Sequence, residues 1–176
     1  MTPAEQLTAL MSGPGAELLG RLGEQPLSPA DALRLGTELR AAYPAELVAA
    51  ALAQHELRIA ARAKFSRAMQ MFFTRDGLEQ ASAEPVARHR RGRYPAGGLL
   101  ADLCCGIGGD LIALADGHQV RAVDADPLHL RMAEANAAAY GVAGGVRFEH
   151  RDVRDIDLAA VTAAFIDPAR RTGRGR

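Results

Sequence analysis

The stretch Ala101-Asp-Leu-Cys-Cys-Gly-Ile-Gly-Gly-Asp110 decides the fold expected for the second half of this chain. It overlaps the apolar run Leu99 to Leu103 and precedes a helical pattern over Leu111 to Ala115. Side chains at Gly106 and Gly108 would block a close approach of the backbone to a ligand, so glycine there permits a sharp turn against one. The helix after the turn directs its first N–H groups to the same place, which favours a negative or strongly polar ligand. The stretch therefore predicts a strand, a turn and a helix with a ligand at the turn; a tight connection without a ligand is the alternative.

The alternation of strand and helix continues downstream of this turn. The run Val120 to Val123 is apolar and ends at Asp124, and Pro127 to Tyr140 has the pattern of a helix with proline at its start and glycine after its end. Two further apolar runs, each followed within a few residues by an aspartate, predict strands: Val146 to Phe148 and Ala163 to Ile166. This order is typical of an α/β fold with a parallel, doubly wound sheet, here of about four strands.

The aspartates that follow the strands indicate which chemical groups the ligand carries. Asp124, at an exposed strand end where no packing is expected to depend on it, can accept two hydrogen bonds from the vicinal hydroxyls of a ribose. Asp152, after the third strand, suits an amino group such as that of adenine, and a solvated loop acid is the alternative. A dinucleotide site would carry a third glycine where this chain has Leu111, so that the helix can pack beside a diphosphate. The residues favour an amine-bearing adenosine ligand without a diphosphate.

The N-terminal part of the chain has the patterns of helices. Short helical pieces come first, punctuated by glycine and proline, with Ser28 as a cap before Pro29 at the first helical position. The run Pro44 to Phe73 predicts one long helix or two with a kink, Thr74 to Ala87 predicts another, and His89 to Pro95 predicts a linker. We therefore expect two domains: a helical, arginine-rich region over residues 1–93 and a sheet domain over residues 94–176.

Charge is segregated along the chain although the formal net charge is zero. Residues 58–93 hold 9 basic and 3 acidic residues, and every basic residue of the chain except Lys64 is arginine. Because the guanidinium fork matches phosphate, the segment from Arg58 to Arg93 is a candidate phosphate-binding surface. The alternative is a solvated helix face whose arginines pair with the acidic second half of the chain.

Several classes of protein are excluded or disfavoured. No apolar run is long enough for a membrane helix, and the N-terminus lacks the pattern of a secretion signal, so we expect a soluble, cytoplasmic protein. Cys104 and Cys105 are adjacent and therefore poorly placed for an ordinary disulfide, which fits a reducing compartment. No metal site is predicted.

Four segments carry a resemblance to a known class of enzyme. They resemble the successive motifs of class I S-adenosylmethionine (SAM) dependent methyltransferases, and within that class trimethylguanosine synthase-like proteins and RNA uridine-C5 methyltransferases. The upstream stretch from Arg62 to Gln80 resembles the N-terminal part of bacterial methyltransferases that end in a THUMP-like domain. The four segments are the glycine stretch quoted above, Ala122-Val-Asp-Ala-Asp-Pro127, Asn136-Ala-Ala-Ala-Tyr-Gly-Val142 and Phe165-Ile-Asp-Pro168.

The resemblance implies a Rossmann-like sheet, SAM as the cofactor and a role for each matching residue. Asp124 would bind the ribose of SAM and Asp152 the adenine. Asp167 and Pro168 occupy the position that shapes the methyl-acceptor pocket in this class, and they are the candidate catalytic residues. The methionine end of SAM would be held by the turn after the first strand: Asp102, Cys105, Gly106 and Gly108.

The sequence departs from both RNA-modifying patterns. Enzymes that methylate exocyclic base amines often carry two prolines and an aromatic residue where this chain reads Asp167-Pro-Ala-Arg-Arg171, so no stacking platform for a flipped base is present at that position. Uridine-C5 enzymes need a nucleophilic cysteine, whereas Cys104 and Cys105 lie in the cofactor turn. Small side chains under the cofactor are the better interpretation of these two residues.

The functional hypothesis is a SAM-dependent methyltransferase acting on a base in structured RNA (ribosomal or transfer RNA). A methyltransferase of protein or small molecules, a dinucleotide-dependent oxidoreductase and a non-enzymatic nucleoside-binding module are the alternatives. About four strands are recognisable where the class has seven, so we expect a fragment that is marginally stable alone. Such a fragment is expected to show weak or no SAM binding and no methyl transfer, and to self-associate through the strand that ends at Ile166.

Overall fold

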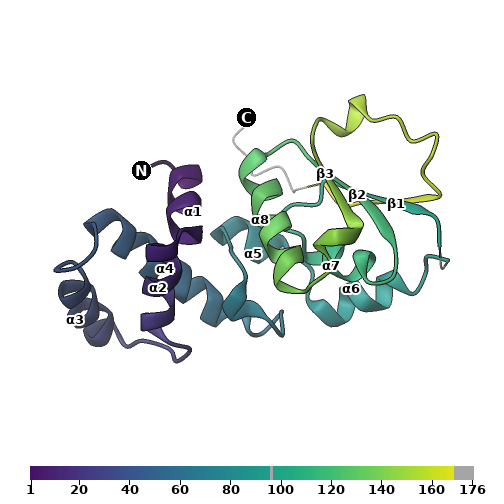
Figure 1. Cartoon of the computed structure of the whole chain (residues 1–176). Coiled ribbons are helices and arrows are strands. Elements are labelled where there is room, and N and C mark those ends of the chain that lie inside the picture. Colours follow the sequence, from purple (N-terminus) through teal and green to yellow (C-terminus); the bar gives the residue numbers. More distant parts are fainter. Residues whose placement is uncertain (96, 169–176) are drawn as a thin grey trace, which may run out of the picture. The chain divides into compact units, whose positions relative to one another are not determined.

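The computed structural model describes residues 1–95 and 97–168 of the chain. Contacts within it define two compact units, residues 1–74 (unit 1) and residues 75–176 (unit 2). Unit 1 is built from helices, whereas unit 2 holds a four-stranded sheet (Figure 1). Among the described residues, no helix is both long and apolar enough to span a membrane.

The helices of unit 1 pack around a core made mainly of leucine side chains. The first three helices each begin after a hydroxyl residue that caps a backbone N–H, and each carries proline in its first turn. The predicted cap at Ser28 is confirmed, because its Oγ accepts a hydrogen bond from Asp31 N at 3.1 Å. The buried core includes Leu10, Leu18, Leu22, Leu39 and Val48. The elements of unit 1 are α1 (Pro3–Met11), α2 (Gly13–Leu22), α3 (Pro29–Leu39), α4 (Ala45–Ala61) and the 3-10 helix η1 (Ala68–Gln70).

One long helix, or two with a kink, was expected over Pro44 to Phe73, whereas α4 ends at Ala61. After a turn the chain folds back, and η1 packs against α4. Reversal of the chain buries Phe65 and Phe73, whose ring centroids lie 5.9 Å apart. The apolar residues of the returning segment happen to continue the helical spacing of α4. The periodicity therefore predicted a helix longer than the one observed.

Arg58 is a core residue of unit 1 and not part of a basic surface. Its side chain is buried, its Nε donates a hydrogen bond to Met71 O at 2.8 Å, and its guanidinium lies 4.8 Å from the centroid of the Phe72 ring. Burial lowers the pKa of this guanidinium to about 10. The expectation that Arg58 offers its charge to phosphate is therefore wrong, because the fold uses the guanidinium to satisfy a buried carbonyl.

Unit 2 begins with two short helices where one was expected over Thr74 to Ala87. They are α5 (Arg75–Gln80) and α6 (Glu84–Arg91). Pro85 lies in the first turn of α6, where its missing N–H would break a continuous helix. The predicted linker at His89 therefore begins inside α6.

Helix α6 packs along the first helix of the sheet region, α7 (Gly109–Ala115). An ion pair joins Arg90 to Asp110, and Arg91 Nε donates to Asp116 O at 3.0 Å. Both α5 and α6 belong to the same compact unit as the sheet, so the two units divide after Thr74, whereas the sequence predicted a division at residue 93.

The expected α/β fold is confirmed in the second half of the chain. All neighbouring strands pair in parallel, in the order β3-β2-β1-β4. Residue Asp102 of β1 lies between Ala122 of β2 and Phe165 of β4 in the register, so the carboxyl ends of these strands meet at one edge of the sheet. The elements are β1 (Leu99–Leu103), β2 (Gln119–Asp124), α8 (Pro127–Ala139), η2 (Ala143–Gly145), β3 (Val146–His150), η3 (Val153–Asp155) and β4 (Ala163–Ile166).

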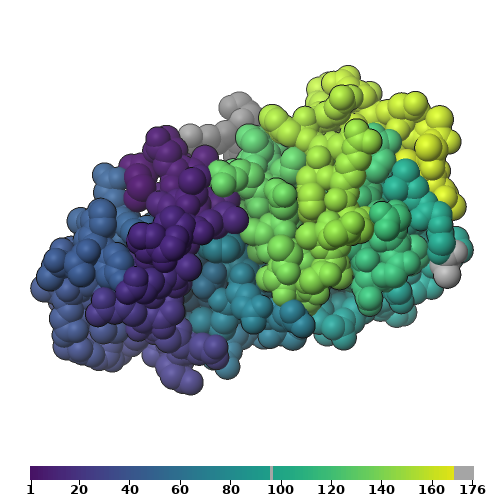
Figure 2. Space-filling view, viewed as in Figure 1, coloured from purple at the N-terminus to yellow at the C-terminus, as the bar shows by residue number. Residues whose placement is uncertain are grey.

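Each face of the sheet buries a different set of side chains. Leu100, Val120 and Ala122 pack against α7 and α8 on one face. The opposite face is covered by Val153, Ile156 and Val161, which pack on the alternate residues Ala101, Leu103 and Val123. Among the described strands β3 and β4 form the two edges, and the light-green to yellow segments that contain them lie at the surface in Figure 2. Ile166 at the end of β4 is 56% exposed.

Candidate functional site

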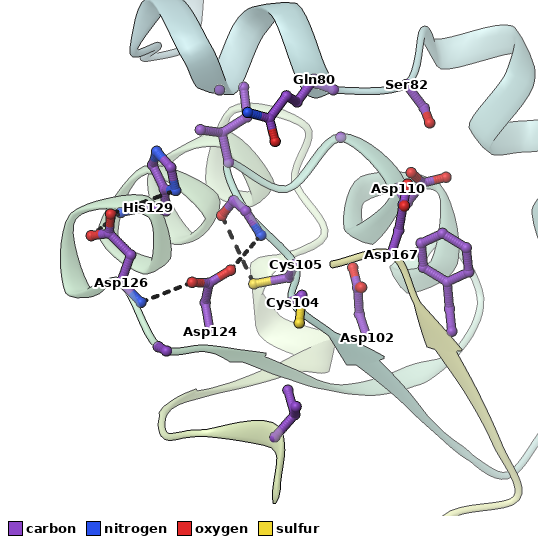
Figure 3. A pocket seen from close by; sticks show the side chains of 18 of the residues that line it. Gln80, Ser82, Asp102, Cys104, Cys105, Asp110, Asp124, Asp126, His129 and Asp167 are labelled. Atoms are coloured by element: carbon purple, nitrogen blue, oxygen red, sulfur yellow. Dashed lines mark hydrogen bonds and ion pairs between the residues drawn. The ribbon is translucent and has the colours of Figure 1, made fainter. Parts of the chain in front are cut away.

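A cavity of about 730 Å³ opens beside the carboxyl ends of β1, β2 and β4 (Figure 3). Its volume lies in the range typical of small-molecule sites, and its place is the one where parallel α/β sheets bind ligands. Gly108 and Pro168 are not among its described lining residues. The other predicted site residues all line it: Asp102, Cys105, Gly106, Asp124, Asp152 and Asp167.

The turn after β1 depends on left-handed backbone conformations at Cys104, Gly106 and Gly108. A side chain on Gly106 would meet no atom within 4 Å, so this glycine leaves open space beside the cavity. A Cβ on Gly108 would lie 3.2 Å from Ala133 Cα, so this glycine permits the close packing of the turn on α8. A contact of Gly108 with the methionine end of the cofactor stays a prediction.

Asp124 ties the end of β2 to the glycine turn. Its Oδ2 accepts a hydrogen bond from Gly106 N, and its Oδ1 accepts one from Asp126 N, both at 2.8 Å. Asp124 was expected at an exposed strand end where no packing depends on it, whereas these two hydrogen bonds connect it to the neighbouring turns. The same two hydrogen bonds hold the carboxylate in one orientation at the cavity wall, where its remaining lone pairs can accept hydrogen bonds from a ligand.

Asp102 is the most unusual side chain of the site. It is 1% exposed, and neither of its carboxyl oxygens has a hydrogen-bond partner in the described part of the chain. Burial raises the pKa of Asp102 well above its usual value, and the nearby carboxylates of Asp110, Asp124 and Asp167 raise it further, against the opposing effect of Arg90. A buried carboxyl without a partner is costly unless a ligand supplies one, and an ammonium group would do so.

Neither cysteine of the turn has the character of a nucleophile. Both thiols are free, and Cys105 is buried. Burial raises the pKa of Cys105, and burial together with the charge of Asp124 raises that of Cys104, so both favour the neutral thiol.

Asp152 and Asp167 lie at the rim of the cavity. Asp152 is paired with Arg154 through its Oδ2 and the arginine Nη2 at 2.6 Å, and hydrogen bonds from Arg154 lower the pKa of Asp152 to about 2. Asp167 is exposed and follows β4 directly. The departure noted at residues 169–171 lies outside the described residues.

The cavity is strongly acidic. Its described lining includes no lysine and no arginine, yet it holds six aspartates: Asp102, Asp110, Asp124, Asp126, Asp152 and Asp167. Despite this density of carboxylates, no group of His, Cys, Asp and Glu residues in the described chain is arranged to hold a metal ion.

Sequence reasoning missed the wall formed by the connection between α5 and α6. Gln80, Ala81 and Ser82 line the cavity there. The connection approaches the glycine turn so closely that a Cβ on Gly109 would lie 3.2 Å from Ala81 Cβ and 3.4 Å from Ser82 O. Gly109 was the available signal, since a further glycine beyond the turn itself indicates a close approach of another segment.

The buried carboxyl of Asp102 should make the stability of the chain depend on pH. The folded chain binds the Asp102 proton more tightly than the unfolded chain, so the free energy of unfolding should decrease as pH rises from about 4 toward the raised pKa. The limiting slope for one proton is about 1.4 kcal/mol per pH unit. The free energy of unfolding is measured by denaturant unfolding at several pH values without added ligand. Wild type should show this additional decrease with pH, and Asp102→Asn should not. An equal pH dependence of the two proteins would contradict the raised pKa of Asp102. The matched control is Asp116→Asn, on an exposed helix end.

Comparisons with known proteins agree on the class. Two uncharacterized S-adenosylmethionine-dependent methyltransferases, from two strains of Mycobacterium tuberculosis, are 44% identical to this chain over 113 residues. Each match covers 61% of this chain and 29% of the relative, so the chain spans less than a third of these relatives.

Two solved structures are also similar. A putative methyltransferase from Porphyromonas gingivalis W83 superposes with a TM-score of 0.54 at 19% identity, over 71% of this chain and 36% of that one, which shows the shared fold. An RNA methyltransferase from Salinibacter ruber in complex with S-adenosyl-L-homocysteine has a TM-score of 0.43 at 27% identity, over 46% of this chain and 56% of that one.

The α/β part of this chain has a parallel, Rossmann-like sheet and is similar in sequence to SAM-dependent methyltransferases. More particularly, residues 97–167 match the family described as RNA cap guanine-N2 methyltransferase. Residues 3–61 match a separate family described as a domain of unknown function, DUF8688.

Proposed function

We propose that the cavity binds SAM and that the chain belongs to an enzyme that methylates a base in structured RNA, ribosomal or transfer. The observation that carries SAM binding is the pairing of an oriented carboxylate, Asp124, with a buried carboxyl that has no protein partner among the described residues, Asp102. The first suits the hydroxyls of a ribose and the second suits the ammonium of an amino acid, and SAM carries both groups. Asp152 is the proposed contact of the adenine amine.

The acidic lining also separates SAM from a dinucleotide. SAM brings a sulfonium and an ammonium, which a lining rich in carboxyl groups and without lysine or arginine favours, whereas the same lining disfavours the diphosphate of NAD. Leu111, fully buried against the sheet, occupies the place of the glycine that a diphosphate site requires. Because a cavity forms within the described residues, we expect weak but measurable SAM binding. Isothermal titration calorimetry should detect SAM and not NAD, and the reverse order of affinity would overturn the assignment.

Methyl transfer from SAM requires little acid–base catalysis by the protein. SAM, when bound, supplies a methyl group that its sulfonium has already activated. The chain's residues orient the ligand and the acceptor and exclude water from the line between them. Asp167, exposed beside the cavity, is the proposed acceptor-side residue, since its carboxylate can accept a hydrogen bond from an acceptor N–H. Pro168 is proposed to shape the same side.

Two observations support RNA as the substrate: the description of the matched family and the basic segment. Arg58 does not contribute to that segment's surface, because its side chain is buried. A methyltransferase of proteins or small molecules is the other candidate, and retention on structured RNA at moderate salt separates the two. A cytoplasmic location and a THUMP-like domain stay predictions. Mass spectrometry of RNA nucleosides from a strain that lacks the gene would identify the base, and an unchanged nucleoside profile would count against an RNA substrate.

Neutralising exposed arginines of the basic segment should weaken RNA binding across sequences. Arg67, Arg75 and Arg93 are exposed, and their triple substitution by glutamine should reduce the slope of log affinity against log salt by roughly one for each phosphate that the variant no longer binds. Fluorescence anisotropy with labelled transfer RNA measures this slope. The matched control is the triple substitution of Arg34, Arg40 and Arg147, which are exposed outside the segment. Equal slopes in both triple variants would favour a solvated face without a role in binding.

A further inference from the structure

The Asp102 carboxyl is surrounded by conditions that oppose its ionisation. It is 1% exposed, and carboxyl groups face it from three other places: Asp110 at the start of α7, Asp124 at the end of β2 and Asp167 after β4. Figure 3 shows Asp124 on one side of Asp102 and Asp110 on the other. Burial first, and then these three charges, raise the pKa of Asp102. Without a cationic ligand, the protein therefore favours the protonated carboxyl.

Arg90 opposes this effect only in part. Its guanidinium pairs with Asp110, and its Nη1 donates a hydrogen bond to Ser82 Oγ at 3.1 Å. Neither oxygen of Asp102 accepts a hydrogen bond in the part of the chain that the structure describes. Arg90 therefore acts on Asp102 through its charge alone, and the carboxylate of Asp110 offsets that charge.

A ligand ammonium placed against Asp102 would reverse the preference. It brings a full positive charge and N–H donors to a carboxyl that has neither, so the ionised form becomes the favoured one. The carboxyl O–H bond then breaks, its proton passes to the solvent, and the carboxylate pairs with the ammonium. One carboxylic acid and one ammonium thus give one ion pair and one free proton.

We propose that the cavity binds an amino-acid ligand in exchange for a proton, which Asp102 releases when the ligand ammonium docks against it. This inference rests on the proposed SAM binding and adds its regulation. Because the protonated form competes with the ligand, affinity for SAM should rise with pH while the free protein still holds this proton. The rise should reach at most about tenfold per pH unit for one proton. Acidification would correspondingly weaken SAM binding.

Other titratable groups near the site are weaker sources of the proton. Burial raises the pKa of Tyr94, Cys104 and Cys105, so these groups are neutral near and below neutral pH and do not exchange a proton there. His129 also lines the cavity, and its Nδ1 lies 3.7 Å from Asp126 Oδ2. Histidine ordinarily titrates between about pH 5 and 8, so His129 is the rival source.

The test counts protons by isothermal titration calorimetry at about pH 5.5, where an ordinary aspartate is ionised and an α-ammonium is charged. Titrations in buffers of different ionisation enthalpy give the number of protons released, as the slope of observed enthalpy against buffer enthalpy. SAM and S-adenosyl-L-homocysteine should each release about one proton from wild type. Methylthioadenosine keeps the adenine and the ribose but has no ammonium, and it should release none.

Three variants assign the proton to a residue. Asp102→Asn should bind SAM more weakly and release no proton. His129→Gln removes the rival source and should still release about one proton. Asp126→Asn removes another carboxyl of the same cavity, keeps an oxygen that can cap α8, and should also retain the release.

The possible outcomes separate this inference from the proposed function. SAM binding by wild type without proton exchange would overturn the inference while SAM binding stands. A release that disappears in His129→Gln and persists in Asp102→Asn would also overturn it, because the proton would then come from the histidine. No binding of SAM by wild type would overturn the proposed function as well.

Discussion

Replacing Asp124 by alanine is expected to lower the affinity for SAM by about a hundredfold or more. The substitution removes the carboxylate proposed to accept hydrogen bonds from both ribose hydroxyls, and hydrogen bonds to a charged group contribute about 1.5–3 kcal/mol each. It also leaves Gly106 N and Asp126 N without their acceptor, so the turn loses its orientation. Calorimetry on the folded variant measures the change.

Removal of these two hydrogen bonds within the protein should also reduce the free energy of unfolding, by about 1–3 kcal/mol. Circular dichroism at the titration temperature therefore has to show that the variant is folded before its affinity is compared. Asp116→Ala removes the same charge from an exposed helix end of unit 2 and should bind SAM as wild type does. A folded Asp124→Ala variant with unchanged affinity would show that the ribose does not lie at this residue.

A large loss of stability is expected for Gly108→Ala. Gly108 has a φ of 88°, where an alanine costs about 1–2 kcal/mol, and its Cβ would lie 3.2 Å from the backbone of α8 at Ala133. Overpacking of this kind adds about 1–3 kcal/mol, so a total loss of about 2–5 kcal/mol is expected. Denaturant unfolding followed by circular dichroism measures it.

Gly141→Ala is the matched control for this substitution. Gly141 has a φ of 75°, but a Cβ there meets no atom within 4 Å, so only the conformational cost applies. The difference in unfolding free energy between the two variants measures the cost of the contact between the added Cβ and α8. Equal losses would mean that α8 shifts without cost and that the contact does not constrain Gly108.

Local signals predicted the elements whose formation depends on neighbouring residues. Ser28 and Pro29 start α3 because the cap and the fixed proline dihedral act within one turn. Pro85 is a local signal of the same kind for the start of α6, although the apolar spacing continues through the break before it. The end of α4 was not predictable in this way, because it depends on the burial of Phe65 and Phe73 in the returning segment.

By itself, the sequence determined the parallel α/β class, the glycine turn and the aspartates at the strand ends, since parallel pairing brings successive carboxyl ends to one edge. Only the tertiary structure decided that Arg58 is buried, that Gly108 faces α8 and that the Gln80–Ser82 connection forms the second wall of the cavity. The physical reason is the range of the interactions. Strand, turn and cap propensities act over a few residues, whereas burial of a charge or the approach of two backbones depends on segments that meet only after the chain has folded.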